Sequence, residues 1–245
     1  FIRSNYKIKL TSEGVLLKKR AEEIMDLIDK TRTEFKSNDE IIAGDIYIGT
    51  AETKAIDLIA KIIKEMQNDY PNIIYHIHSG NYGDITDKLG LIDFGVLIEP
   101  ADLSLYDYIE IPTEEVWGIL ARRDSKIAKK KFIEKKDLLN LPIIVPKTLM
   151  HNKSDNNKFL QWFKDDIEKL NIVLTKNLVY SSIFMVKEGI GYSLTIIDIN
   201  NKDICFIPLK PKLKPRINIV WKKGQIFSQA GKIFLDKLYN KFEKK

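Results

Sequence analysis

The stretch GDIYIGTAETKAIDLIAKIIKEMQNDYPNIIYHIHSGNYGDITDKLGLIDFGVLIEP, residues 44–100, decides the fold. Three short apolar runs, GDIYIGT, NIIYHIHSG and DFGVLIEP, are typical of strands. Between them lie an amphipathic helical pattern that ends at Pro71 and a shorter helical segment, YGDITDKLGLI. Strands that alternate with helices at this spacing predict right-handed crossovers and a parallel sheet. Ligands bind beyond the carboxyl ends of such strands, here GTAET, SGNYG and IEP.

The second half of the chain repeats this α/β pattern more loosely. Strands are predicted at EVWGILARR, PIIVP, NIVLTKN, YSLTI, ICFIPL and RINIVWKK, with helices at KKFIEKKDLLNL, NNKFLQWFKDDIEKL and SSIFMVKEGIG and a closing helix at SQAGKIFLDKLYNKFEKK. The pattern predicts two Rossmann-like α/β lobes that are joined by crossing strands and that enclose a ligand cleft. We assign residues 44–120 and 217–245 to lobe I, and residues 121–216 to lobe II.

A long amphipathic helix is predicted over residues 11–40. Thr11 and Ser12 are candidates for its N-cap, and Glu13 in the first turn suits the positive end of the helix dipole. A heptad seam runs along the helix through Leu17, Ala21, Ile24, Ile28, Thr31 and Phe35. Such a stripe either packs on its own domain or pairs with a second helix. We interpret this segment as a dimerisation helix.

The positive charge is concentrated near the N-terminus. Residues 1–20 hold six Lys and Arg against one acid, in a chain with a formal net charge of +6. This arm either meets a polyanion or is simply solvated, and charge alone favours neither.

Composition predicts a cytosolic protein and offers no catalyst. Cys205 is the single cysteine, which excludes an internal disulfide, and no apolar run reaches the length of about 20 residues that spans a membrane. His76 and His78 share one strand face and so form the one candidate pair of metal ligands. We interpret them as a polar strand-end pair, because no CxxC or HExxH pattern accompanies them. We therefore expect no metal, no cofactor and no enzymatic activity.

The order of these motifs resembles that of LysR-type transcriptional regulators. The opening FIR…LTSEG is similar to the end of the wing and the start of the linker helix in that family. GDIYIGT, LIDFGVLIEP, DLLNLPIIV, MVKEGIGYSL and FIPLKP…NIVWKK follow in the family's order. The resemblance implies two lobes of the periplasmic-binding-protein type behind a dimerisation helix. Residues 1–10 would be a wing remnant, and the DNA-binding winged helix-turn-helix would be absent from these residues.

The resemblance also implies partners and a set of contact residues. DNA would be bound by the full-length protein, with backbone contacts from Arg3 and Lys7, and the chain would form a homodimer or homotetramer. A small-molecule effector, a carboxylate or an amino-acid-like metabolite, would bind between the lobes. The family's ligand contacts correspond here to Thr50, Ala51, Glu52, Thr53, Asn81, Pro100, Thr148, Ser181 and Ser182.

Two features of these ligand positions stay open. Hydroxyl side chains at a helix N-terminus suit a carboxylate ligand, but they are equally typical of simple N-caps. If the lobes face each other as in the family, we expect Thr53 and either Ser181 or Ser182 to face one ligand from opposite lobes. Glu52 would repel an anion unless it points outward or binds an ammonium group.

Two other protein classes share parts of this pattern. A solute-binding protein of the periplasmic type has the same two-lobed clamp but no use for a basic arm and a heptad helix. A structural dimer module would keep the helix but would not need polar turns around a cleft. A transcriptional regulator accounts for both features.

Overall fold

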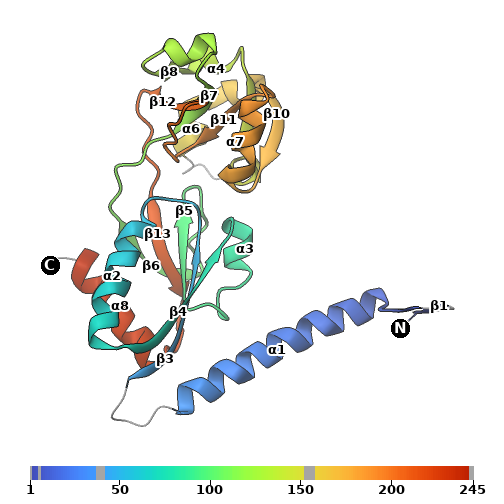
Figure 1. Ribbon diagram of the computed structural model, residues 1–245, viewed down its shortest axis with the longest axis vertical. Helices are drawn as coiled ribbons and strands as arrows, with labels where there is room; N and C mark the ends of the chain where they lie inside the picture. The colour runs from blue at the N-terminus through green and yellow to red at the C-terminus, as the bar shows by residue number, and fades with distance from the viewer. Residues whose placement is uncertain (1, 5–6, 37–41, 152–157, 243–245) are drawn as a thin grey trace.

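The computed structural model describes residues 2–4, 7–36, 42–151 and 158–242. A short hairpin leads into a long helix, which is followed by two α/β lobes stacked along the longest axis of the molecule (Figure 1). The N-terminal hairpin consists of β1 (Ile2–Ser4) and β2 (Lys7–Lys9), which pair antiparallel with Arg3 opposite Ile8. Arg3 and Lys7 thus lie on the two strands of one hairpin.

Helix α1 (Ser12–Lys36) projects away from the lobes (Figure 1). Its N-terminus is capped as predicted, because the Gly14 N–H donates to Thr11 Oγ1 at 3.1 Å. The predicted seam is bare: Leu17 is 72% exposed, Ile24 57% and Ile28 39%, and Ala21 is exposed as well. The Phe35 side chain lies outside the described residues. Among the described residues, the seam of this helix is therefore not buried against its own domain.

Lobe I is a five-stranded sheet in the order β4-β3-β5-β13-β6. Its elements are β3 (Ala43–Thr50), α2 (Ile56–Asp69), β4 (Asn72–Ser79), α3 (Tyr82–Thr86), β5 (Phe94–Ile98), β6 (Tyr106–Ile111), β13 (Ile217–Lys222) and α8 (Gln229–Phe242). Strand β3 pairs in parallel with both β4 and β5, as the crossovers predicted, whereas β13 runs antiparallel to β5 and β6.

Helices cover both faces of the lobe I sheet. On one face α2 and α8 bury Ile59 and Phe234, and the Phe94 ring lies 5.0 Å from that of Phe234 between ring centroids. On the other face α3 buries Ile85 against Leu97. Burial of these apolar side chains supplies the main stabilisation of the lobe.

Lobe II is a six-stranded sheet in the order β10-β9-β11-β7-β12-β8. Its elements are β7 (Gly118–Arg122), the 3₁₀ helix η1 (Lys126–Lys129), β8 (Ile133–Glu134), α4 (Lys135–Leu138), β9 (Pro142–Pro146), α5 (Lys147–His151), α6 (Lys158–Phe163), the 3₁₀ helix η2 (Lys164–Lys169), β10 (Asn171–Lys176), α7 (Val179–Lys187), β11 (Tyr192–Thr195) and β12 (Ile204–Lys210). Val186 of α7 packs against Leu120 and Ile144 of the sheet.

The chain passes between the lobes twice, at residues 112–117 and 211–216. Gly118 and Leu120 belong to β7 and hence to the second sheet, so the first passage precedes the predicted boundary at residue 120. The two passages lie side by side, with the Trp117 N–H donating to Leu213 O at 2.8 Å. Lobe II is therefore an insertion held by two adjacent segments.

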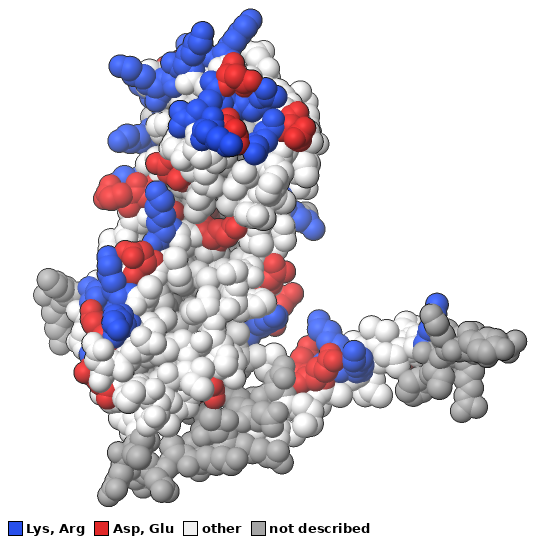
Figure 2. Space-filling view, in the orientation of Figure 1, with Lys and Arg blue, Asp and Glu red and all other residues white. Residues whose placement is uncertain are grey.

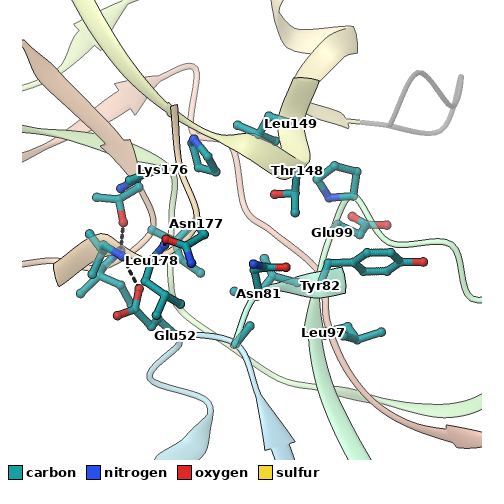
Figure 3. A pocket seen from close by; sticks show the side chains of 18 of the residues that line it. Glu52, Asn81, Tyr82, Leu97, Glu99, Thr148, Leu149, Lys176, Asn177 and Leu178 are labelled. Carbon is teal, nitrogen blue, oxygen red and sulfur yellow. Dashed lines mark hydrogen bonds between the residues drawn. The ribbon is translucent and has the colours of Figure 1, made fainter. Parts of the chain in front are cut away.

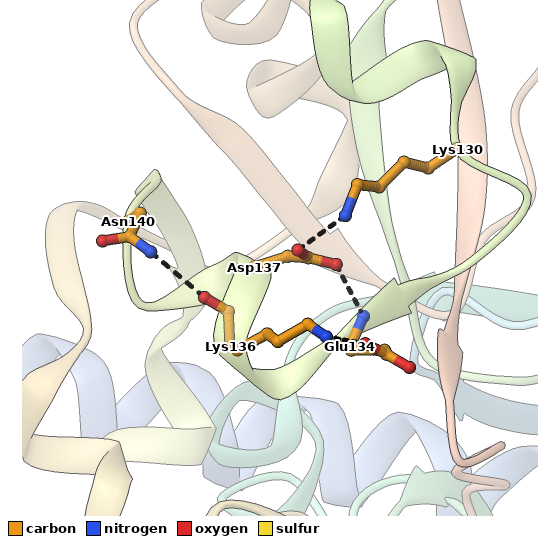
Figure 4. A network of polar contacts seen from close by, with 5 residues as sticks. All are labelled: Lys130, Glu134, Lys136, Asp137 and Asn140. Carbon is orange, nitrogen blue, oxygen red and sulfur yellow. Dashed lines mark hydrogen bonds and ion pairs between the residues drawn. The ribbon is translucent and has the colours of Figure 1, made fainter.

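The surface carries a second concentration of basic residues, at the end of lobe II that lies far from α1 (Figure 2). Residues 122–136 hold eight Lys and Arg against two acids. Part of this charge is paired within the lobe, since Lys130 contacts Asp137 at 2.6 Å and Lys136 contacts Glu134 at 2.7 Å (Figure 4). A net count along the chain suggested that the positive charge is confined to the N-terminal arm. Lobe II in fact carries a second basic surface.

Within the described ranges, no helix combines the length and the apolar character that crossing a membrane requires.

Candidate functional site

A cavity of about 90 Å³ lies between the two lobes, where the carboxyl ends of their strands meet (Figure 3). Lobe I supplies the segments that follow β3, β4 and β5. Lobe II supplies the segments that follow β9, β10 and β11. The residues around the cavity include Ala51, Glu52, Asn81, Tyr82, Glu99, Pro100, Thr148, Lys176, Asn177, Val179 and Thr195.

Five of the nine predicted contact residues line this cavity: Ala51, Glu52, Asn81, Pro100 and Thr148. Asn81 also has a local task at the start of α3. Its side chain accepts from the Asp84 N–H at 3.2 Å, and Asp84 accepts from the Asn81 N–H at 3.0 Å. This reciprocal capping box fixes Asn81 at the cavity wall.

Thr53 does not line the cavity, contrary to the expectation that it faces a ligand. Helix α2 begins at Ile56, and the buried Thr53 hydroxyl instead donates to Glu115 Oε2 at 2.5 Å. The Lys54 N–H donates to the other carboxylate oxygen of Glu115 at 2.9 Å. Glu115 lies 62 residues further along the chain, and it ties the loop after β3 to the passage between the lobes.

Three more of the predicted contact residues lie away from the cavity lining: Thr50, Ser181 and Ser182. Thr50 donates to Ala51 O at 2.9 Å, and Ser181 is exposed on α7. Ser182 is 1% exposed and donates to Val179 O at 2.6 Å. Because α7 begins at Val179, Ser182 faces the interior of lobe II, and Thr53 and Ser182 do not face one another across a ligand.

Replacing Thr53 by alanine should therefore lower stability. The substitution removes a buried hydrogen bond to a carboxylate, which costs about 1–3 kcal/mol in the free energy of unfolding. Urea titrations of wild type and Thr53→Ala measure this loss. Asn140→Ala is the control, because the exposed Asn140 side chain donates to Lys136 O at the surface of lobe II. Equal stability of wild type and Thr53→Ala would contradict the structural role of this hydroxyl.

Lys176, at the end of β10, is a buried amine that lines the cavity. It is 7% exposed, and its Nζ donates to Ser193 Oγ at 2.7 Å and to Ser182 Oγ at 3.3 Å. Desolvation lowers the pKa of Lys176 from 10.5 to about 7, and the negative charge of Glu52 partly opposes this shift. The ammonium form is thus held by hydroxyl groups and by a carboxylate from the opposite lobe.

Glu52 connects the two lobes. Its Oε2 accepts a short hydrogen bond from the Val179 N–H, the first residue of α7 (Figure 3). Leu178 occupies the N-cap position of α7 and has no side-chain oxygen with which to cap the helix. The carboxylate of one lobe therefore caps a helix of the other.

A wider groove of about 580 Å³ opens beside the cavity. It shares Asn81, Tyr82, Pro100, Thr148 and Asn177 with the cavity lining. Its other side chains include three acids and one base: Asp84, Asp87, Asp102 and Lys147. Hydrogen bonds from Ser104 hold the pKa of Asp102 below its usual value, so this carboxyl is ionised at neutral pH. Desolvation raises the pKa of Tyr82, which keeps the phenol neutral.

The two histidines of β4 have separate partners. His76 Nε2 lies 2.7 Å from Asp45 Oδ1, and its ring stacks on Tyr47 at 4.4 Å between centroids. His78 Nε2 lies 3.1 Å from Lys88 Nζ. In the part of the chain that the structure describes, no group of three His, Cys, Asp or Glu residues is arranged to hold a metal ion.

Sequence reasoning missed Lys176, Asn177, Glu99 and Tyr82, which line the cavity. A signal for Lys176 exists in the alternation of β10, where Ile172, Leu174 and Lys176 share one strand face. That pattern places Lys176 inward, at the carboxyl end of a strand. The other three lie at the ends of predicted strands or helices, where no pattern distinguishes them.

Comparison with known proteins places this geometry in a family. The family model of the LysR substrate binding domain matches residues 40–242. The chain is similar to the uncharacterized HTH-type transcriptional regulator YbhD of Escherichia coli, with 24% identity over 98% of this chain and 77% of that protein.

Two solved structures share the fold. Full-length CbnR, solved with its target DNA, has a TM-score of 0.71 and 13% identity over 97% of this chain and 85% of that one. The effector-binding domain of QuiR, solved with shikimate, has a TM-score of 0.66 and 14% identity over 82% of this chain and 98% of that one.

Proposed function

The chain belongs to the LysR substrate binding domain family, and from that premise we propose that it is the sensing part of a ligand-responsive transcriptional regulator. A small-molecule effector binds in the cavity between the lobes and changes how they are held together. The observation that carries this proposal is the meeting of strand ends from both lobes around one cavity, with Glu52 joining the two walls. The protein acts by binding rather than by catalysis.

The polar groups favour an amino-acid-like effector. The N-terminus of α7 and Lys176 offer N–H donors and positive charge to a carboxylate. The adjoining groove offers Asp84, Asp87 and Asp102 to an ammonium group. A ligand that carries both charges satisfies both regions, whereas a simple anion meets acidic side chains along the groove.

DNA recognition is proposed to pass through a winged helix-turn-helix, a module that is not among the residues the structure describes. Two findings support this: YbhD is named an HTH-type regulator, and CbnR was solved with its target DNA. In this proposal the hairpin of β1 and β2 lies next to that module, and Arg3 and Lys7 contact the DNA backbone. A protein that acts on DNA in this way works in the cytoplasm, as a dimer or tetramer assembled through α1.

The experiment is a binding screen with compounds of one carbon skeleton. Each compound has a five-carbon chain. L-norvaline carries both charges, pentanoate carries only the negative charge, and pentylamine carries only the positive charge. Thermal shift should show the largest stabilisation with the zwitterion, because a ligand stabilises the state that it binds. A failure of all three, and of a wider panel of amino acids and carboxylates, would contradict the proposed effector class.

Replacing Thr148 by alanine should then weaken the binding of any ligand that the screen finds. Thr148 lines both the cavity and the groove. The loss of one hydrogen bond to a charged ligand group corresponds to roughly a tenfold weaker affinity. Calorimetric titration measures the change, and Asn140→Ala, outside the cleft, should bind as wild type does. Unchanged affinity in Thr148→Ala would place the ligand elsewhere.

A further inference from the structure

The carboxylate of Glu52 sits where a ligand's carboxylate would be expected. It accepts from the first N–H of α7, a helix of nine residues. Free N–H groups and the helix dipole make such an N-terminus an anion site. The buried amine of Lys176, at the end of β10, lines the same cavity from lobe II, and the charge of Glu52 favours its protonated form. This subsite is therefore filled by a carboxylate of the protein itself.

Glu52 reaches the subsite from the opposite lobe. It lies in the loop between β3 and α2 of lobe I, whereas Val179 and Lys176 belong to lobe II. Among the described residues, the hydrogen bond between Glu52 and Val179 is the polar contact that joins the two lobes at the cavity. The lobes are otherwise connected by the two passages at residues 112–117 and 211–216. Breaking it would free the cavity wall of lobe I from that of lobe II.

We propose that Glu52 is a built-in competitor, which occupies the carboxylate subsite in the free protein and is displaced when an effector binds. The inference rests on the proposed function and specifies its regulation. Binding exchanges the carboxylate of Glu52 for that of the ligand, and the exchange releases the direct link between the lobes. Ligand binding at the Val179 N–H thereby changes how the two lobes are connected.

The same arrangement sets the specificity of the site. A group tethered to the protein competes at an effective concentration on the order of millimolar or higher. A simple carboxylate brings no compensating contact and binds weakly. A ligand whose ammonium group also reaches Asp84, Asp87 or Asp102 gains additional contacts and displaces Glu52. Glu52 thus selects amino-acid-like ligands against plain anions.

The test follows the Val179 amide by nuclear magnetic resonance, with acetate as the probe and sodium chloride at equal ionic strength as the salt control. In wild type, the Val179 amide should exchange slowly with solvent and respond little to acetate. In Glu52→Ala it should exchange faster, and acetate should shift its resonance at concentrations roughly tenfold lower or less. Glu52→Gln keeps an acceptor but loses the charge, so it should fall between the two.

Glu114→Gln is the matched control. Glu114 lies in the first passage between the lobes and pairs with Lys214 at 3.1 Å, and its side chain is 95% exposed. This variant should behave as wild type does. Should Glu52→Ala fail to fold, Glu52→Gln carries the test alone.

Equal Val179 exchange and an equal acetate response in wild type and both Glu52 variants would overturn the proposal. Its failure is distinguishable from failure of the proposed function, because the acetate readout needs no natural effector. A screen without an effector, together with a clear acetate difference, would leave the role of Glu52 intact. An effector that binds equally well to wild type and Glu52→Ala would leave the regulator intact and remove Glu52 as competitor.

Discussion

Replacing Lys176 by methionine should stabilise the protein by roughly 3–5 kcal/mol at pH 6 and should remove a pH dependence of its stability. The pKa of Lys176 falls from 10.5 in the unfolded chain to about 7 in the folded protein. Each unit of this difference corresponds to about 1.4 kcal/mol. Methionine fills a similar volume without a charge, and Ser193 and Ser182 remain hydrogen-bonded to each other at 2.9 Å.

The sign of the pH dependence follows from the direction of the shift. Between pH 7 and pH 10.5 the unfolded chain holds the Lys176 proton and the folded protein does not, so the free energy of unfolding rises with pH. Below pH 7 both states are protonated, and the full cost of burying the charge is present. The difference between wild type and Lys176→Met should thus be largest below pH 7 and shrink toward pH 10.5.

Urea titrations at intervals from pH 6 to pH 10 measure this difference. Subtracting the free energies of unfolding of the two proteins at each pH cancels the contributions of tyrosines and other groups that titrate in both. Lys214→Met is the control, since Lys214 is half exposed and pairs with Glu114 at the surface. A constant difference across this pH range would show that the pKa of Lys176 is not lowered by folding.

Replacing Ile24 by aspartate should dissociate the oligomer while leaving the lobes folded. In the proposed dimer, Ile24 lies in the middle of the α1 seam, which is exposed in the single chain. An unpaired carboxylate in a desolvated helix pair costs about 3–5 kcal/mol, which corresponds to a dissociation constant raised by roughly two to four orders of magnitude. Sedimentation velocity over a range of protein concentrations measures this change.

Lys19→Asp is the matched control for this prediction. Lys19 lies on the same helix, on the side away from the seam, and is exposed. Lys19→Asp introduces the same aspartate side chain as Ile24→Asp but does not place it between the two helices. Circular dichroism on both variants confirms that the lobes remain folded. If Ile24→Asp sediments as wild type does, the oligomer is held by other surfaces.

Much of the fold could be predicted because apolar periodicity is a local property of the sequence. The runs that became β3, β4 and β5 alternate with helical patterns, and this order fixes the parallel pairing of the three strands. The first passage between the lobes was placed too late, since Gly118 begins a strand that continues an apolar run without any break. Which sheet a strand joins depends on partners distant in sequence, here β11 and β12.

The site was predictable by region but not by side chain. The loops after the strands were correctly expected to meet at a cavity, because parallel strands share their carboxyl edge. The direction of each side chain depends on where a helix begins, and α2 begins at Ile56 rather than at Thr53. The contact of Thr53 with Glu115 joins residues far apart in the chain, and no local pattern indicates it.

The position of β13 constrains the order in which the chain can fold during synthesis. This strand lies between β5 and β6 in the lobe I sheet, although it follows the whole of lobe II in sequence. Until residues 217–222 leave the ribosome, the strand that pairs with both β5 and β6 is missing. The side of the Phe94 core that α8 covers also stays exposed. Lobe II is continuous and can close first, as domains generally fold as units during translation. A stalled or prematurely ended chain would therefore present a finished lobe II beside an unfinished lobe I with two exposed strand edges, a species prone to aggregation.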